Sequence, residues 1–218
     1  MKKRMLLTIL IFGSVWGCIE VFAGGALKGV IPHSSVVPTV LGLAVLASAR
    51  YLVRTPGSST AIGVVAALFR LANAGGYFCH LWAIFLIGVS FDIVVSLLGS
   101  RWEKIRWQCL AGASTAYLTT SLFSLTLTYI IRYKWWVSGG LPKVLGYIGI
   151  DGSLIALGAL ILIPLGYKLG GPLTALSEAR PKPVFIGASL LTVLLWGCLL
   201  YTSPSPRDLS TSRMPSSA

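Results

Sequence analysis

Apolar residues gather in long runs along this chain, and short polar links separate the runs. A helix needs about 20 mostly apolar residues to cross a hydrocarbon core about 30 Å thick. Seven runs reach or approach that length: 5–26, 36–53, 59–75, 78–98, 108–131, 144–167 and 184–197. The pattern predicts an all-α fold, a polytopic transmembrane helical bundle of six to seven spans. The count is seven if the short last run, 184–197, also crosses the membrane, and six if it does not.

Helix-breaking residues mark the ends of these runs. Pro56 and Gly57 separate the second run from the third, and Pro142 precedes the sixth. Gly170, Gly171 and Pro172 follow the sixth run, and glycine with proline is typical of a turn. We therefore expect the sixth helix to end before Gly170.

The composition supports a membrane protein and excludes an ordinary soluble domain. Of 218 residues, 55% are hydrophobic and only 11% are charged, whereas soluble domains carry about 25% charged residues. The mean hydropathy is +0.81. The net charge is +12, but the cations lie between apolar runs, without the basic patch interleaved with aromatics that nucleic-acid binding needs. We expect the lipid bilayer as partner and no nucleic acid.

The cations alternate between the links in a way that predicts orientation. Lys and Arg concentrate in cytoplasmic loops of membrane proteins. With a cytoplasmic N-terminus, eleven cations lie inside and four outside; the four are Lys28, Arg132, Lys134 and Lys143. This favours a prokaryotic inner (plasma) membrane protein with its N-terminus in the cytoplasm. A basic start followed by an apolar run also resembles a signal peptide, with residues 21–23 as a cleavage site, but the run's length favours a retained helix.

The last part of the chain changes abruptly in composition. The string from Cys198 to Ala218 resembles the translation of a transposase-type sequencing adapter with its index. We therefore expect a single bundle over residues 1–197, truncated at its C-terminus, and a non-native tail over 198–218. A Ser/Pro-rich disordered tail is the alternative interpretation.

Three ionisable residues inside the runs are the main candidates for chemistry. A charge at the centre of a membrane helix costs about 2.5–3.5 kcal/mol on insertion scales, so such residues are paired or functional. Counting about 1.5 Å per residue places Glu20 and Asp92 within about 6 Å of Arg70 in height. We predict a buried cluster of Glu20, Arg70 and Asp92, with Asn73 one turn above. It forms either a substrate or proton site or a structural ion-pair lock.

The other polar residues point less clearly to function. Asp151 near the outer third of the sixth run is expected to face water or cap a helix. His33, His80 and Cys79 fall at the outer interface, and without nearby carboxylates they are weak metal ligands. We expect no metal, no cofactor and no enzymatic activity, since no nucleophile or phosphate-binding motif occurs.

Small residues form stripes on two of the runs. Gly13 and Gly17, continued by Gly24, share a small-x-x-x-small spacing, and Gly112 with Ala116 repeats it on the fifth run. Such faces allow close helix packing. They serve internal packing, or, for Gly13, Gly17 and Gly24, the docking of a partner membrane subunit.

Several of these residues together carry a family resemblance. Trp16, Gly17 and Glu20 in the first run, Arg70 late in the third and Asp92 in the fourth resemble a group of small uncharacterised prokaryotic polytopic proteins with a W-G-x-x-E first helix. In size and architecture the chain is also similar to the S components of energy-coupling-factor transporters. That likeness implies a pocket for a small solute of vitamin or cofactor type and partner ATPase and coupling subunits. A seventh run departs from the six-helix S-component pattern.

Two functions follow as expectations. The first is a small-solute uptake or permease subunit that binds its solute through Glu20, Arg70, Asn73 and Asp92. The second is a non-transport membrane scaffold or assembly factor, in which the same cluster only fixes the packing of helices.

Overall fold

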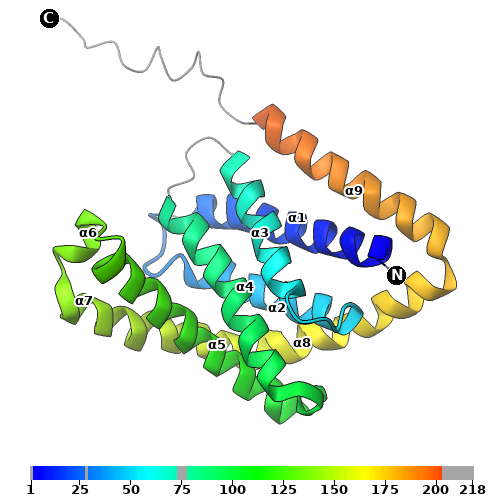
Figure 1. Ribbon diagram of the computed structural model, residues 1–218. Coiled ribbons are helices and arrows are strands. Elements are labelled where there is room, and N and C mark those ends of the chain that lie inside the picture. Colours follow the sequence, from blue (N-terminus) through cyan, green and yellow to red (C-terminus); the bar gives the residue numbers. More distant parts are fainter. Residues whose placement is uncertain (1, 28, 73–77, 203–218) are drawn as a thin grey trace, which may run out of the picture.

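The computed structural model describes residues 2–27, 29–72 and 78–202, and all regular structure in these ranges is helical. The first half forms α1 (Lys2–Leu27), α2 (Val36–Leu52), α3 (Ser58–Ala72) and α4 (Phe78–Leu98). A short 3-10 turn, η1 (Gly99–Glu103), leads into α5 (Ile105–Leu125). In Figure 1, α3 and α4 run steeply across the direction of α1 and α8.

The second half is a long hairpin. A π-helical turn, η2 (Thr126–Ile130), extends α5, and the short α6 (Lys134–Val137) and α7 (Gly140–Gly146) lie at the hairpin tip. A second π turn, η3 (Tyr147–Asp151), continues directly into α8 (Gly152–Ala179), and α9 (Pro181–Thr202) follows. Figure 1 shows α9 returning along the outside of α1.

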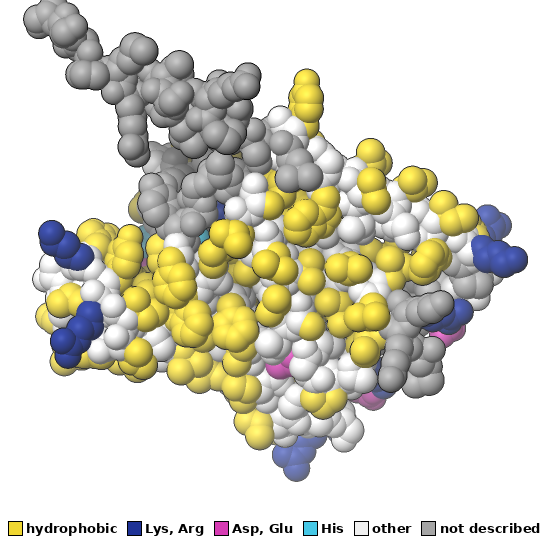
Figure 2. Space-filling model, turned by 45° about the horizontal axis from the view of Figure 1, so that its top comes forward, with side chains coloured by type: hydrophobic (Ala, Val, Ile, Leu, Met, Phe, Trp, Pro, Cys, Tyr) yellow, Lys and Arg dark blue, Asp and Glu magenta, His cyan; other side chains and the backbone are white. Residues whose placement is uncertain are grey.

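Four helical stretches in the described ranges are long and apolar enough to cross a membrane: Arg4–Leu27, Phe78–Glu103, Gly140–Ala179 and Lys182–Leu199. The apolar helices α2 and α3 are shorter, at 17 and 15 residues. Figure 2 shows apolar side chains over the middle of one face, with Lys and Arg at its margins. The predicted all-α class is confirmed.

The end predicted for the sixth helix is wrong. The helix continues through Gly170, Gly171 and Pro172 to Ala179, so that Gly140–Ala179 runs for 40 residues, about 60 Å at 1.5 Å per residue. A side chain at Gly170 would meet Tyr51 and the Ser48 carbonyl of α2. The glycine therefore serves close helix packing rather than a turn.

The core forms around a tryptophan seated on glycines. Trp16 of α1 is fully buried, and a Cβ added to Gly42 of α2 would collide with its indole nitrogen. A Cβ at Gly63 of α3 would lie 3.6 Å from the same ring. The missing side chain of Gly42 thus makes room on α2 for the large ring, which also lies against α3 and so joins three helices.

Helix α9 packs loosely, and it is longer than the predicted run 184–197. Trp196 Nε1 donates to Ser14 Oγ at 2.9 Å, and its ring meets Phe69 edge-on at 5.1 Å. The helix continues through residue 202. Residues 203–218, most of the predicted non-native tail, lie outside the described residues.

Candidate functional site

A buried ion pair joins the end of α2 and the start of α3 to α4. Asp92 of α4 accepts a hydrogen bond from Arg50 Nη1 through Oδ1 at 3.2 Å, and both side chains are less than one-tenth exposed. The other carboxylate oxygen, Oδ2, accepts from the backbone amide of Thr60 at 2.7 Å and from its hydroxyl at 2.9 Å. Both oxygens of Asp92 are therefore satisfied.

Asp92 acts as a cap that a neighbouring helix supplies. Thr60 is the third residue of α3, and the first four amides of a helix have no acceptor within it. A carboxylate there satisfies one such amide and interacts favourably with the helix dipole. Asp92 thus anchors α4 to the start of α3.

Arg50 completes the connection from α2. It lies in the last turn of that helix, where a cation is favoured by the helix dipole. Its Nη1 also donates to the Thr55 carbonyl and to Ser58 Oγ, the latter at 3.2 Å. All of its hydrogen bonds to described residues leave from Nη1, although a guanidinium has five N–H donors. The N–H donors on Nε and Nη2 of Arg50 therefore remain available for a further acceptor.

The predicted cluster of Glu20, Arg70 and Asp92 forms only in part: Arg70 meets Glu20, but Asp92 lies with Arg50 and Thr60. Arg70 Nη1 donates to the backbone carbonyl of Glu20 at 3.0 Å, while the Glu20 carboxylate accepts from Trp16 Nε1 at 3.2 Å. Asp92 instead contacts Thr60, ten residues before Arg70 on α3, which is about 15 Å along that helix. Asn73, predicted beside this cluster, lies outside the described residues.

Arg50 is one of the eleven cations that the charge pattern assigns to the cytoplasmic side, and the sequence did not predict that it would meet Asp92. Arg50 lies inside the apolar run 36–53, and it is buried in the structure. A cation within a run is the same signal that drew attention to Arg70. Depth counted along separate helices did not reveal which of the two cations meets Asp92.

A cleft of about 340 Å³ with both polar and apolar side chains in its walls opens beside Arg50; we call it the basic-end cleft. Its polar lining comes from the last turn of α2, the α2–α3 link, the end of α4, η1 and α8: Arg50, Arg54, Ser96, Ser100, Glu103 and Tyr167. Arg54 and Glu103 form an exposed ion pair at 2.8 Å. Trp102 also lines the cleft, and its ring meets Phe91 and Tyr167 edge-on.

A second polar pair lies toward the hairpin tip, away from the basic-end cleft. His33 Nδ1 lies 3.0 Å from Asp151 Oδ1, with the histidine 40% and the aspartate 9% exposed. The backbone of His33 has a φ of 55°, a conformation in which histidine is enriched among non-glycine residues. Asp151 is therefore neither a simple cap nor free in water. His80 contacts its neighbour Cys79 at 3.7 Å, and within the described ranges no three His, Cys, Asp or Glu residues gather to hold a metal.

The predicted docking glycines divide into two kinds. Side chains at Gly13 and Gly17 would collide with Val65 and Phe69 of α3, so α3 of the same chain occupies that face. Gly24 has open space around it. On α5, Gly112 packs against Ala159 of α8, which is the internal use of small residues.

Comparison with protein-family models, with curated proteins and with solved structures found no match for this chain.

Proposed function

We propose that this chain is a multi-pass membrane protein of the transport class, a solute-binding or permease subunit that takes a small organic anion in the basic-end cleft. In this proposal the bundle has six or seven spans in a prokaryotic inner membrane, with a cytoplasmic N-terminus. The basic end then faces the cytoplasm. Arg50 and Arg54 replace Arg70 as the anion-binding cations.

The observation that carries the proposal is a buried guanidinium with unused donors at the wall of a cleft. Arg50 is 8% exposed and lines the basic-end cleft. Asp92 holds it through Nη1 alone, which leaves the other nitrogens as donors for a carboxylate or phosphate oxygen. Ionisable groups at membrane depth are functional candidates for this reason.

The rest of the cleft suits a small anion. Its volume of about 340 Å³ falls in the range of ligand pockets, about 300–1,000 Å³. The Arg54–Glu103 pair is more than half exposed on both sides, and exposed pairs contribute only about 0–1 kcal/mol. An entering anion can therefore take the place of Glu103 at little cost, with the hydroxyls of Ser96, Ser100 and Tyr167 nearby.

The scaffold alternative has its own supporting observation. Both oxygens of Asp92 are used within the protein, and Arg70 is bound to a backbone carbonyl. These contacts fix helices against one another without any solute. In the scaffold reading, Arg50 and Asp92 form a structural lock and the cleft is incidental.

Ligand-dependent stability tests the proposal. The full chain in lipid nanodiscs is heated with inorganic phosphate and with a panel of small mono- and dicarboxylates. A ligand that binds only the folded state raises its stability with concentration, so we expect at least one anion to raise Tm. Arg54→Gln should abolish the rise, whereas Lys104→Gln, a matched loss of charge at the same end outside the cleft, should keep it.

Two results would contradict the anion site: no anion raises Tm, or the rise persists in Arg54→Gln. Either leaves the scaffold reading. Uptake of the stabilising anion into sealed vesicles containing the chain then separates transport from binding alone.

A further inference from the structure

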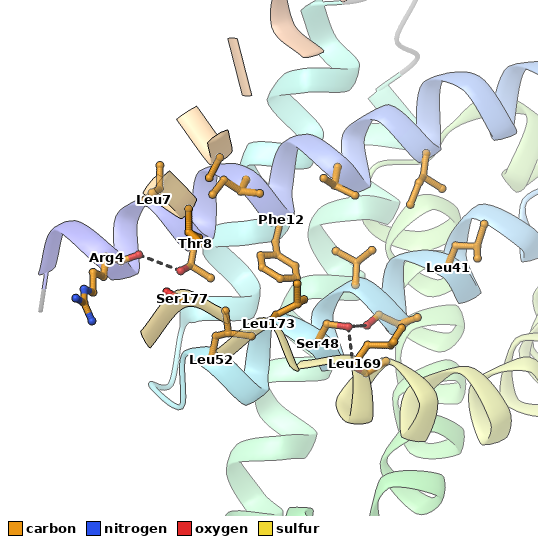
Figure 3. Close-up of a pocket in the computed structure, with 18 of the residues that line it drawn as sticks. Arg4, Leu7, Thr8, Phe12, Leu41, Ser48, Leu52, Leu169, Leu173 and Ser177 are labelled. Atoms are coloured by element: carbon orange, nitrogen blue, oxygen red, sulfur yellow. Dashed lines mark hydrogen bonds between the residues drawn. The ribbon is translucent and has the colours of Figure 1, made fainter. Parts of the chain in front are cut away.

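A second cavity, unrelated to the basic-end cleft, lies between α1, α2, α8 and α9. We call it the α1–α9 groove. It has a volume of about 590 Å³ and shares no lining residue with the basic-end cleft. Figure 3 looks into it, with Arg4 at one end and Leu41 toward the other.

The walls of the groove are mostly apolar, and two of its hydroxyls are engaged in hydrogen bonds within the protein. Leucine, isoleucine, valine and phenylalanine side chains form most of the lining. Of its hydroxyls, Thr8 donates to the Arg4 carbonyl at 3.0 Å, and Ser48 to the Gly166 carbonyl at 2.7 Å. Because these two hydroxyls already have acceptors and the third, that of Ser177, lies at the Arg4 end, the occupant needs an apolar body.

The groove is long and follows one side of α1. Its lining residues on that helix extend from Arg4 to Ile19, which is about 22 Å at 1.5 Å per residue. Half of a hydrocarbon core about 30 Å thick is about 15 Å. The groove can therefore hold an acyl chain along the full depth of one leaflet.

Charge is confined to one end of the groove. Arg4 is exposed and lines that end together with Ser177 of α8. Arg180 and Lys182 do not line the groove, but both are exposed and lie in the short stretch of chain between the lining residues Ser177 and Val184, and so close to this end. Glu178 is the acidic residue of this stretch. Three cations against one acid at the mouth of an apolar groove complement an anionic headgroup.

We propose that the α1–α9 groove is a binding site for one anionic phospholipid. One acyl chain lies between α1 and α8, and the headgroup phosphate meets Arg4 and Arg180. The lipid fills the space between loosely packed α9 and the rest of the bundle. It thereby attaches α9 to the bundle.

Native mass spectrometry of the full chain tests this site. The protein is released from nanodiscs that hold equal amounts of phosphatidylglycerol and phosphatidylcholine with identical acyl chains. We expect one phosphatidylglycerol to be retained in preference to phosphatidylcholine. Arg4→Gln and Arg180→Gln should each lower that preference about fivefold, from about 1 kcal/mol per cation near a headgroup. Lys104→Gln, which lies outside the groove, should leave it unchanged.

A second pair of variants tests the groove itself. Ala188 lines it from α9, so Ala188→Phe should fill it and abolish retention of the lipid. Gly187, the neighbouring residue, faces open space, so Gly187→Phe should retain lipid as the parent does. Equal retention of both lipids overturns the proposal. The proposal is also overturned if Lys104→Gln lowers the lipid preference as much as Arg4→Gln does, or if Ala188→Phe retains phosphatidylglycerol undiminished. A second copy of the chain bound in place of the lipid would overturn it as well.

Discussion

At the scale of single residues, Arg50 and Asp92 show how a membrane protein holds charges away from water. Arg50 of α2 and Asp92 of α4 bind each other, and each also has a hydrogen-bond partner on α3. Removing one partner of a buried pair leaves an uncompensated charge, which is far costlier than removing both.

This gives a prediction with an internal control. Asp92→Ala should lower the free energy of unfolding by about 3–5 kcal/mol, because Arg50 stays buried without its counterion. The double variant Arg50→Met with Asp92→Leu should lose much less. Unfolding by SDS in mixed micelles, followed by circular dichroism, measures both.

The exposed pair at the same end is the reference. Arg54→Ala should cost about 0–1 kcal/mol, because water screens Arg54 and Glu103. If Asp92→Ala is no more harmful than Arg54→Ala, Asp92 is not the anchor that the contacts indicate. Asp92 is likewise not the anchor if Arg70→Gln lowers the free energy of unfolding more than Asp92→Ala does.

At the scale of elements, glycines determine how closely α8 approaches α2. A Cβ at Gly166 would collide with the backbone carbonyl of Ala44, and one at Gly158 would meet Val40 at 2.8 Å. Gly158 and Gly166 therefore allow α8 to pack closely on α2, as Gly170 does, although Gly170 was predicted to belong to a turn.

Alanine substitutions at two glycines of the stretch Gly140–Ala179 should change the stability of the fold differently. Gly166→Ala forces α8 away from α2 and should destabilise the fold by about 1–3 kcal/mol, the usual range for overpacking. Gly146→Ala, in α7, meets nothing within 4 Å and should be neutral or stabilising by up to about 1 kcal/mol, since alanine favours helix. Thermal unfolding in the same detergent compares them, and equal effects would contradict the close α2–α8 contact.

At the scale of the whole molecule, charge should set which end faces the cytoplasm. Arg50, Arg54, Arg101, Lys104 and Arg106 lie around the α2–α3 link and η1, whereas Lys134 and Lys143 lie at the hairpin tip of α6 and α7. The larger cationic group favours the cytoplasmic side.

Labelling of introduced cysteines measures this orientation. In a background with all four cysteines of the chain replaced by alanine, Ser100→Cys in η1 should react with an impermeant maleimide only from the cytoplasmic side. Ser138→Cys at the hairpin tip should react only from the opposite side. Reaction of both from one side would show that α5 and α8 do not cross the bilayer as proposed.

The helices themselves were predictable from sequence, and the physical reason is local. In hydrocarbon each backbone polar group needs a partner within its own segment, so a long apolar run becomes a helix whatever its neighbours are. The runs 36–53 and 78–98 accordingly match α2 (Val36–Leu52) and α4 (Phe78–Leu98) within a residue.

The pairing of charges and the shape of the cavities were decided only by tertiary structure. Distances along the chain do not give the offset between crossing helices, and this offset places Asp92 beside Arg50 and Thr60 rather than Arg70. The same offset places Gly170 against α2, and α8 continues beyond this contact through Pro172. Sequence by itself thus determined the helical class and the bounds of helices such as α2 and α4, but not where α8 ends or how far α9 extends. Packing, which depends on side chains distant in the chain, determined which polar groups meet and where space remains for ligands.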